Sequence, residues 1–121
     1  MENKITLVLG ASLKPNRYSN LAIQRLRRHN ITTFALGLRT GQVADVLINT
    51  IPSNLEGIHT VTLYLNPARQ KEYFDYILSL APSRVIFNPG TENPELMELL
   101  DRHSISYEIA CTLTLLATGQ Y

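Results

Sequence analysis

The chain has 121 residues, of which 45% are hydrophobic and 17% charged, and this balance excludes a disordered chain, a collagen and a coiled coil. The formal net charge of +1 argues against a general nucleic-acid binder, and no apolar run is long enough for a membrane span. A single cysteine excludes an internal disulfide, and no secretory signal is recognisable. We therefore expect one domain over residues 1–121, located in the cytoplasm.

Charge is distributed unevenly along the chain. Residues 1–40 contain seven basic residues and one acidic residue, a net charge of +6, whereas residues 41–121 contain four basic and nine acidic residues, a net charge of −5. A basic segment on a nearly neutral protein favours a compact polyanion, such as a nucleotide or a phosphorylated cofactor, over a long nucleic acid. The alternative for Arg25, Arg27 and Arg28 is a solvated helix face.

The first expected element is a buried strand at Ile5–Leu9, which ends at a glycine. The loop Gly10–Ser19 follows, and its proline delays the start of the next helix. That helix is expected at Leu21–His29, capped by one of the two polar residues before it. Asn30 suits the left-handed conformation at the helix end.

The next segment contains two further strands, at Thr32–Leu36 and Thr60–Leu65. The turn Gly37–Gly41 follows the first of them. Between this turn and the later strand, the stretch Gln42–Gly57 is expected to be a short strand or an irregular crossover.

The last part of the chain contains the same type of helix start twice. Asn66-Pro67 and Asn93-Pro94 each place an N-cap asparagine before a proline at the first helical position, and Pro82 ends the first of the two helices. The remaining expected elements are two strands and a short apolar tail, at Arg84–Phe87, Ser106–Ala110 and Thr112–Tyr121.

Strands that alternate with helices predict an α/β fold: a Rossmann-like, doubly wound, mostly parallel five-stranded sheet with helices on both faces. In such sheets a ligand lies outside the carboxyl ends of the strands, beside the first strand. The segments expected to line the site are Gly10–Asn20, Gly37–Thr40, Asn66–Pro67 and Asn88–Asn93.

The loop after the first strand has the residue types of a phosphate-binding loop. A glycine after a strand, with a helix N-terminus shortly after it, presents free backbone N–H groups to an anion. Ser12, Lys14, Arg17 and Ser19 add side-chain donors. The dinucleotide fingerprint G-x-G-x-x-G is absent, because Gly10 is the only glycine of the loop.

The residues at the end of the second strand distinguish between two classes of cofactor. Sheets that bind NAD usually place an acidic residue there to bind the adenosine ribose, whereas Leu36-Gly37-Leu38-Arg39 contains none. A guanidinium binds phosphate oxygens in pairs, so Arg39 favours an adenosine with an extra ribose phosphate, as in coenzyme A or NADP. The alternative is that Arg39 is a surface turn residue.

Five segments form a recognisable order along the chain: Val8-Leu9-Gly10-Ala11-Ser12, Lys14-Pro15-Asn16-Arg17, Asn66-Pro67, Asn88-Pro89-Gly90 and Cys111. This order resembles the small bacterial CoA-binding proteins, single-domain relatives of the CoA-binding domain of the succinyl-CoA synthetase α subunit. The resemblance spans nearly the whole chain. One departure is Leu36-Gly37-Leu38, where the family commonly has a Val-Asn-Pro-like run.

The resemblance implies coenzyme A or an acyl-CoA as the cofactor. It implies that the first loop holds the CoA phosphates, that the turn after the second strand contacts the adenosine end, and that the loops after the third and fourth strands line the cofactor. The implied cofactor-binding residues are Gly10, Ala11, Ser12, Lys14, Arg17, Tyr18, Arg39, Asn66, Pro67, Asn88, Pro89 and Gly90.

No set of residues points to catalysis or to a metal site. The three histidines lack metal-ligand spacing, Ser12 lacks a paired base, and Glu92 lacks a second carboxylate at fixed spacing. Cys111 has two interpretations: a small buried hydrophobe at a strand end, or a thiol near the CoA thiol that forms a mixed disulfide.

Three functions follow from these residues. The leading hypothesis is a module that binds CoA or an acyl-CoA without catalysis and acts through a partner protein or as a homodimer, with no nucleic-acid or membrane partner. The second is a small NADP- or acyl-CoA-dependent enzyme completed by dimerisation. The third is an interaction domain without a ligand, and the fold alone does not decide among them.

Overall fold

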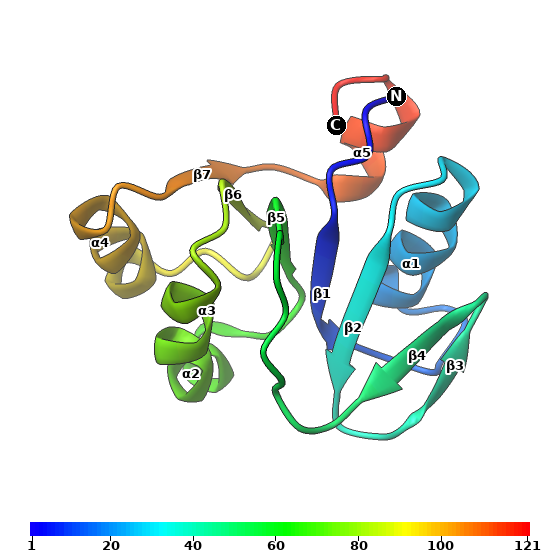
Figure 1. The fold of residues 1–121 in the computed structure, drawn as a ribbon, viewed down its shortest axis with the longest axis horizontal. Coiled ribbons are helices and arrows are strands. Elements are labelled where there is room, and N and C mark those ends of the chain that lie inside the picture. Colours follow the sequence, from blue (N-terminus) through cyan, green and yellow to red (C-terminus); the bar gives the residue numbers. More distant parts are fainter.

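The computed structural model describes residues 1–121 and has one seven-stranded sheet at its centre (Figure 1). The strands lie in the order β3-β4-β2-β1-β5-β6-β7, and all neighbours are parallel except β3 and β4. Their bounds are β1 (Thr6–Ala11), β2 (Thr33–Gly37), β3 (Gly41–Val43), β4 (Val46–Asn49), β5 (Thr60–Leu63), β6 (Arg84–Phe87) and β7 (Ser106–Ile109).

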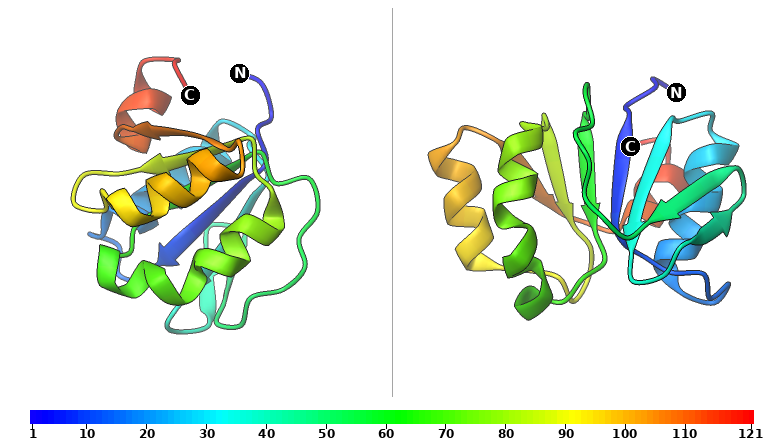
Figure 2. Two further views of the ribbon diagram at one scale, coloured as in Figure 1. Left: turned by 90° about the vertical axis from the view of Figure 1, so that its left-hand side faces the viewer. Right: turned by 60° about the horizontal axis from the view of Figure 1, so that its bottom comes forward.

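The helices form a layer on each face of the sheet (Figure 2). Their bounds are α1 (Tyr18–Arg28), α2 (Pro67–Gln70), α3 (Phe74–Leu80), α4 (Pro94–Arg102) and α5 (Thr112–Ala117), with a 3₁₀ turn η1 at Lys71–Tyr73. Ile77 of α3 and Leu100 of α4 belong to the core on one face, and Ile23 of α1 and Leu116 of α5 belong to the core on the other. The predicted Rossmann-like α/β fold is confirmed.

The predicted number of five strands is wrong, because the stretch after β2 forms a hairpin of β3 and β4. In this hairpin Gln42 is opposite Leu47 and Val43 is opposite Val46. The turn between the strands contains Ala44, whose φ is 52°. A two-residue hairpin turn usually carries glycine or asparagine at such a position, so the sequence lacked the usual signal.

The helices also differ from the prediction in detail. The expected apolar tail contains α5, and Leu116 of this helix is buried in the core beside α1. Helix α1 begins at Tyr18, three residues earlier than expected, and the side chain of Asn20 bonds to the preceding loop rather than capping the helix. Asn30 has the expected left-handed conformation, with φ of 60°.

Half of one sheet face is not covered by a helix (Figure 1). Ala35 of β2 pairs with Ile48 of β4, and both are buried against the α1 layer. The residues before them, Phe34 and Leu47, therefore point to the opposite face, where they are 37% and 64% exposed. The sheet thus carries an accessible apolar surface on β2 and β4.

The last residue is held against the amino ends of the strands. The guanidinium carbon of Arg84 lies 4.5 Å from the centre of the Tyr121 ring, and the Tyr121 hydroxyl forms a hydrogen bond with Thr6. Lys4 Nζ and Arg84 Nη1 donate to the Tyr121 carbonyl oxygen at 2.8 and 3.0 Å. These contacts join the last residue to β1 and β6.

Candidate functional site

The carboxyl ends of the parallel strands meet at one edge of the sheet, where two glycines allow close backbone approach. Gly10 has φ of 97°, and a Cβ on it would lie 2.9 Å from the carbonyl carbon of Tyr64. A Cβ on Gly37 would overlap the carbonyl oxygen of Ala11. The loop after β1 therefore passes between β2 and β5, where the helices change from one face of the sheet to the other.

Hydrogen bonds fix the shape of the loop after β1. Ser12 Oγ accepts from the N–H of Lys14 at 3.1 Å, and the Ser12 carbonyl accepts from Asn20 Nδ2 at 2.9 Å. Helix α1 follows with Arg17 as its N-cap residue, whose side chain makes no capping bond. The N–H groups of the first two helical residues make no hydrogen bond inside the chain. This loop and helix start therefore offer fixed, free donors to an anion.

Three cationic side chains on this edge have no partner. Lys14, Arg17 and Arg39 are exposed and make no ion pair within the chain. No acidic residue occurs between Glu2 and Asp45. The positive charge of the two loops is therefore not neutralised by neighbouring residues of the chain.

Asn88 lies at the centre of a buried polar cluster that joins β5, β6 and α5. Its Nδ2 donates to Thr62 Oγ1 at 2.7 Å and to the Leu63 carbonyl at 2.8 Å, and its Oδ1 accepts from the N–H of Thr112 at 2.9 Å. The hydroxyls of Thr62 and Thr112 are 2.8 Å apart. The two donors of the Asn88 amide are thus used inside the protein.

A second buried amide, which the sequence analysis missed, continues this cluster toward α4. Gln70 is completely buried, and its Nε2 donates to the carbonyls of Leu65 and Thr91 at 2.9 and 2.7 Å. Its Oε1 accepts from Asn93 Nδ2 at 3.0 Å, and Thr91 Oγ1 donates to the Asn88 carbonyl at 2.7 Å. A glutamine in a polar helix turn carries no sequence signal of burial. These bonds hold the loops after β5 and β6 in a fixed relation.

The other predicted residues of the later loops form an exposed rim. Asn66 Oδ1 caps α2 by accepting from the N–H of Arg69 at 3.0 Å, and Pro67 is the first helical residue. Pro89 and Gly90 are exposed, and Gly90 has φ of 89°.

In the first loop, Ala11 is buried, whereas Tyr18 is 70% exposed at the start of α1. Tyr18 therefore presents its ring to solvent beside the unpaired cations of this loop.

Cys111 reaches the same edge after β7 and is half-buried. The N–H of Ala110 donates to the Phe87 carbonyl, which brings Cys111 close to the loop after β6. Burial raises the pKa of the Cys111 thiol. Hydrogen bonds to the side chain and backbone of Thr114 and to the backbone of Leu113 lower the pKa by more than burial raises it. The pKa of this thiol therefore lies below its ordinary value. The thiol is more accessible than that of a core cysteine.

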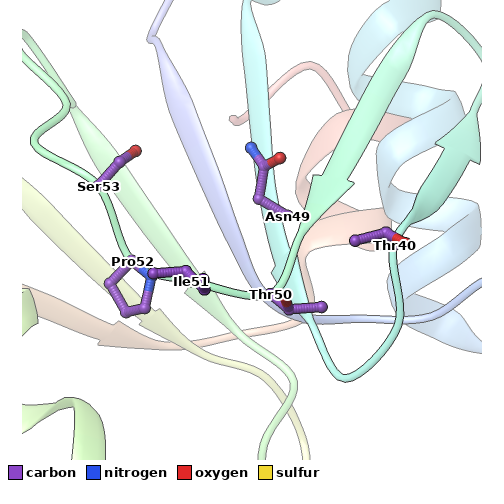
Figure 3. A pocket seen from close by; sticks show the side chains of 6 residues that line it. All are labelled: Thr40, Asn49, Thr50, Ile51, Pro52 and Ser53. Atoms are coloured by element: carbon purple, nitrogen blue, oxygen red, sulfur yellow. The ribbon is translucent and has the colours of Figure 1, made fainter.

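Two hollows lie at the carboxyl end of β4, beside the turn that follows β2. The larger, of about 460 Å³, is lined by Thr40, Asn49, Thr50, Ile51, Pro52 and Ser53 (Figure 3). The smaller, of about 340 Å³, is lined by Thr40, Gly41, Gln42, Leu47, Ile48 and Asn49. None of the twelve predicted residues lines either hollow, although Arg39 directly precedes Thr40. The sequence analysis included Thr40 in a segment expected to line the site, but it assigned no site residue to Gln42–Gly57, which it expected to be a short strand or an irregular crossover.

A doubly wound sheet with free donors and unpaired cations at its carboxyl edge defines a Rossmann-like domain whose edge suits an anionic ligand. The family described as CoA binding domain matches residues 4–117. The chain belongs to this family, and the resemblance noted in the sequence is confirmed. A search of curated proteins finds no match. None of the helices is long and apolar enough to cross a membrane.

Solved structures share the fold over 93–100% of the chain. A crystal structure of an uncharacterized protein is 45% identical, covers 100% of both chains and has a TM-score of 0.96. A hypothetical protein from Pyrococcus horikoshii OT3 is 22% identical over 93% of this chain and 80% of its own, with a TM-score of 0.82. A protein from Thermus thermophilus is 17% identical over 98% of this chain and 91% of its own, with a TM-score of 0.86.

Proposed function

We propose that the protein binds coenzyme A or an acyl-CoA along the carboxyl edge of its sheet. The observation that carries the proposal is the set of unpaired cations Lys14, Arg17 and Arg39, on loops that contain no acidic residue. The 3′-phosphate and the 5′-pyrophosphate of CoA, which are attached to one ribose, match two separate groups of cations. Membership of the CoA-binding domain family supports CoA as the ligand class.

The two groups of cations are assigned to different phosphates. Lys14, Arg17 and the free N–H groups at the start of α1 bind the pyrophosphate, because a helix N-terminus and a close backbone favour a polyanion. Gly10 fixes the course of this loop, since a Cβ there would lie 2.9 Å from the carbonyl carbon of Tyr64. Arg39 binds the ribose phosphate.

The remaining proposed residues line the rest of the ligand. Ala11, Ser12 and Tyr18 flank the phosphates, and the rim after β5 and β6 flanks the pantetheine arm. The rim residues are Asn66, Pro67, Pro89 and Gly90, and the buried Asn88 lies behind them. The Asn88 side chain acts by positioning its loop, since its amide donors are occupied.

Calorimetric titration of two ligands tests the proposal. Arg17→Ala should weaken CoA and 3′-dephospho-CoA alike, by about 10- to 100-fold, because a charge-assisted bond contributes about 1.5–3 kcal/mol. Arg39→Ala should weaken CoA but leave 3′-dephospho-CoA nearly unchanged. Arg28→Ala, an exposed arginine at the far end of α1, is the matched control and should change neither.

The comparison with NAD decides the ligand class. CoA should raise the unfolding temperature of the wild type more than NAD does, because Arg39 replaces the acidic residue that NAD sites use. Equal or greater stabilisation by NAD would remove the basis for CoA.

Binding without catalysis is part of the proposal. The titratable side chains that the edge presents are mainly unpaired cations, and no three His, Cys, Asp or Glu side chains lie together. Incubation with acetyl-CoA should release no thiol above the rate without protein; steady release would favour the alternative of a small acyl-CoA-dependent enzyme.

The proposed partner is a second copy of the chain or another protein. The apolar surface of Phe34 and Leu47 on the uncovered sheet face supports such a contact. Light scattering of the purified protein at increasing concentration would distinguish a dimer from a monomer that needs a different partner.

A further inference from the structure

We propose that His59 is a pH-sensitive switch: protonation of its ring weakens the contacts that hold Tyr121 at the amino ends of the strands. The residues involved, here called the amino-edge cluster, are His59, Thr60, Arg84 and Tyr121. His59 directly precedes β5, and Thr60 and Arg84 are the first residues of β5 and β6. The cluster therefore lies at the end of the sheet opposite to the proposed ligand-binding edge, and the inference does not depend on the binding of CoA.

The backbone of His59 is fixed between two segments of the chain. Its N–H donates to the Ile5 carbonyl at 2.9 Å, and its carbonyl accepts from the N–H of Arg84 at 2.9 Å. His59 is therefore held between the residues before β1 and the start of β6, where a change in its ring affects both.

The side-chain hydrogen bonds of the cluster have a defined direction. Arg84 Nε lies 3.1 Å from Thr60 Oγ1, and because an arginine nitrogen only donates, Thr60 Oγ1 accepts this bond. The same hydroxyl lies 2.7 Å from His59 Nδ1. We assign the hydroxyl hydrogen of Thr60 to His59 Nδ1, which makes this nitrogen an acceptor and places the proton of the neutral ring on Nε2.

Arg84 connects these bonds to Tyr121. Its guanidinium carbon lies 4.5 Å from the centre of the Tyr121 ring, and its Nη1 donates to the Tyr121 carbonyl at 3.0 Å and to Glu108 Oε2 at 3.1 Å. The Arg84 side chain is only 11% exposed, and its Nη2 is buried without a hydrogen-bond partner. The bond that Thr60 accepts from Nε therefore helps to position this enclosed guanidinium over the Tyr121 ring.

A proton on His59 Nδ1 is incompatible with this arrangement. The protonated nitrogen becomes a donor, so the Thr60 hydroxyl would face two donors while its own hydrogen lost its acceptor. Thr60 is completely buried, so water does not replace that acceptor. Protonation thus leaves a buried donor unsatisfied unless the ring or the guanidinium moves, and either movement removes a bond that orients the Thr60 hydroxyl.

The charges around His59 act in the same direction. Burial, Arg84 on β6 and Lys4 before β1 lower the pKa of His59, and Glu2 raises it by less, so that the pKa lies below its ordinary value. Glu108 on β7 is already paired with Arg84 at 3.1 Å. A proton on His59 therefore adds a third cation beside Lys4 and Arg84.

Acidification should consequently loosen the amino-edge cluster. Because the pKa of His59 is lower in the folded chain than in the unfolded chain, the stabilisation from the neutral ring is present above the unfolded pKa and is lost as the pH falls through the folded pKa. The Tyr121 hydroxyl does not titrate in this range, since burial raises its pKa. The part of the cluster that responds is the contact between Arg84 and Tyr121.

NMR of isotope-labelled histidine and tyrosine rings tests the proposal from about pH 8 to about pH 5, the range in which histidine titrates. His59→Asn keeps a side-chain acceptor close to the backbone but takes up no proton. His103→Asn is the matched control, since His103 Nδ1 contacts the Leu99 carbonyl of its own helix, far along the chain from the cluster. Tyr121→Phe identifies the Tyr121 signal.

We expect the wild-type His59 signal to titrate at a lower pH than the His103 signal, and the Tyr121 signal to shift with the midpoint of His59. His59→Asn should leave the Tyr121 signal unchanged by pH, whereas His103→Asn should behave as the wild type. Thr60→Val removes the hydroxyl that links the two residues. In this variant His59 should still titrate, but the Tyr121 signal should not follow it.

Three results would overturn the proposal: a Tyr121 signal that stays fixed while His59 titrates, a Tyr121 shift of the same size in Thr60→Val or His59→Asn, or a His59 midpoint at or above that of His103. Circular dichroism at neutral pH checks that each variant is folded. If His59→Asn does not fold, the comparison of the wild type with Thr60→Val decides.

Discussion

Asn88→Ala should destabilise the protein far more than the same change at Asn66. Asn88 is 2% exposed and makes three side-chain hydrogen bonds, which tie β5, β6 and α5 together at the carboxyl edge. Asn66 is exposed and makes one, the cap of α2. The sequence gives both residues the same apparent role, after a strand and before a proline.

The magnitude follows from the bonds that each change removes. Three hydrogen bonds at about 1 kcal/mol each, with about 1 kcal/mol more for the Thr112 N–H left unpaired in a buried position, predict a loss of about 4 kcal/mol for Asn88→Ala. Loss of an exposed cap predicts about 1 kcal/mol for Asn66→Ala. A domain of this size has a stability of about 5–15 kcal/mol, so Asn88→Ala should remain folded with about 1–11 kcal/mol of stability.

Urea unfolding, followed by circular dichroism, measures both losses. With a slope of about 1.5 kcal/mol per molar urea, the two midpoints should differ by about 2 M. An Asn88→Ala midpoint equal to or above that of Asn66→Ala would refute the structural role of Asn88. It would show that the buried cluster adapts without this amide.

Three further predictions concern single residues. Gly37→Ala should lower the stability measured by thermal unfolding by about 2–3 kcal/mol, because the new methyl overlaps the Ala11 carbonyl. Gly119→Ala has open space around its Cβ and should lower the stability by only about 1 kcal/mol. Equal losses would contradict the close approach at Gly37. Cys111 in the native protein should be alkylated with a pH midpoint below that of an ordinary thiol, and Thr114→Ala should raise this midpoint; an unshifted midpoint would count against the hydrogen bond. The hydrogen bond from Arg27 holds the pKa of Asp45 below its ordinary value, so the stabilisation from this pair is present above the unfolded pKa and is lost as the pH falls through the folded pKa. Asp45→Asn should therefore be slightly less stable than the wild type near pH 7 and equally stable at acidic pH, and a difference that persists in acid would have another origin.

The central strands and their helices were predictable because local signals agreed with the tertiary structure. Apolar runs mark β1, β2, β5 and β6, and the Asn-Pro devices before α2 and α4 appear as predicted, with the asparagines accepting from the backbone. The hairpin was not predictable, since Ala44 occupies the turn without a glycine or asparagine signal. Helix α5 was missed because Cys111 supplies no side-chain cap and the helix depends on packing against α1.

The location of the site was predictable because the topology of the sheet determines it, but the side chains that form the site were not. Residues directly after parallel strands must share one edge, and this brings the loop of Lys14 and the turn of Arg39 to the same end of the sheet. Which side chains remain free was not readable from the sequence. Asn88 and Gln70 are held inside by partners from distant segments, while Asn49 and Ser53 line the larger hollow at the end of β4 from a stretch without a recognisable motif.

The contacts of Tyr121 close the sheet over a long distance in the sequence. Its hydroxyl and carbonyl reach partners 115 and 117 positions earlier, in the first strand and the residues just before it. Contacts between such distant residues form late in folding, because the cost of closing the long loop between them comes first. We expect Tyr121→Ala to leave β1 more open to protease than in the wild type, and equal digestion would show that β1 is held without this side chain.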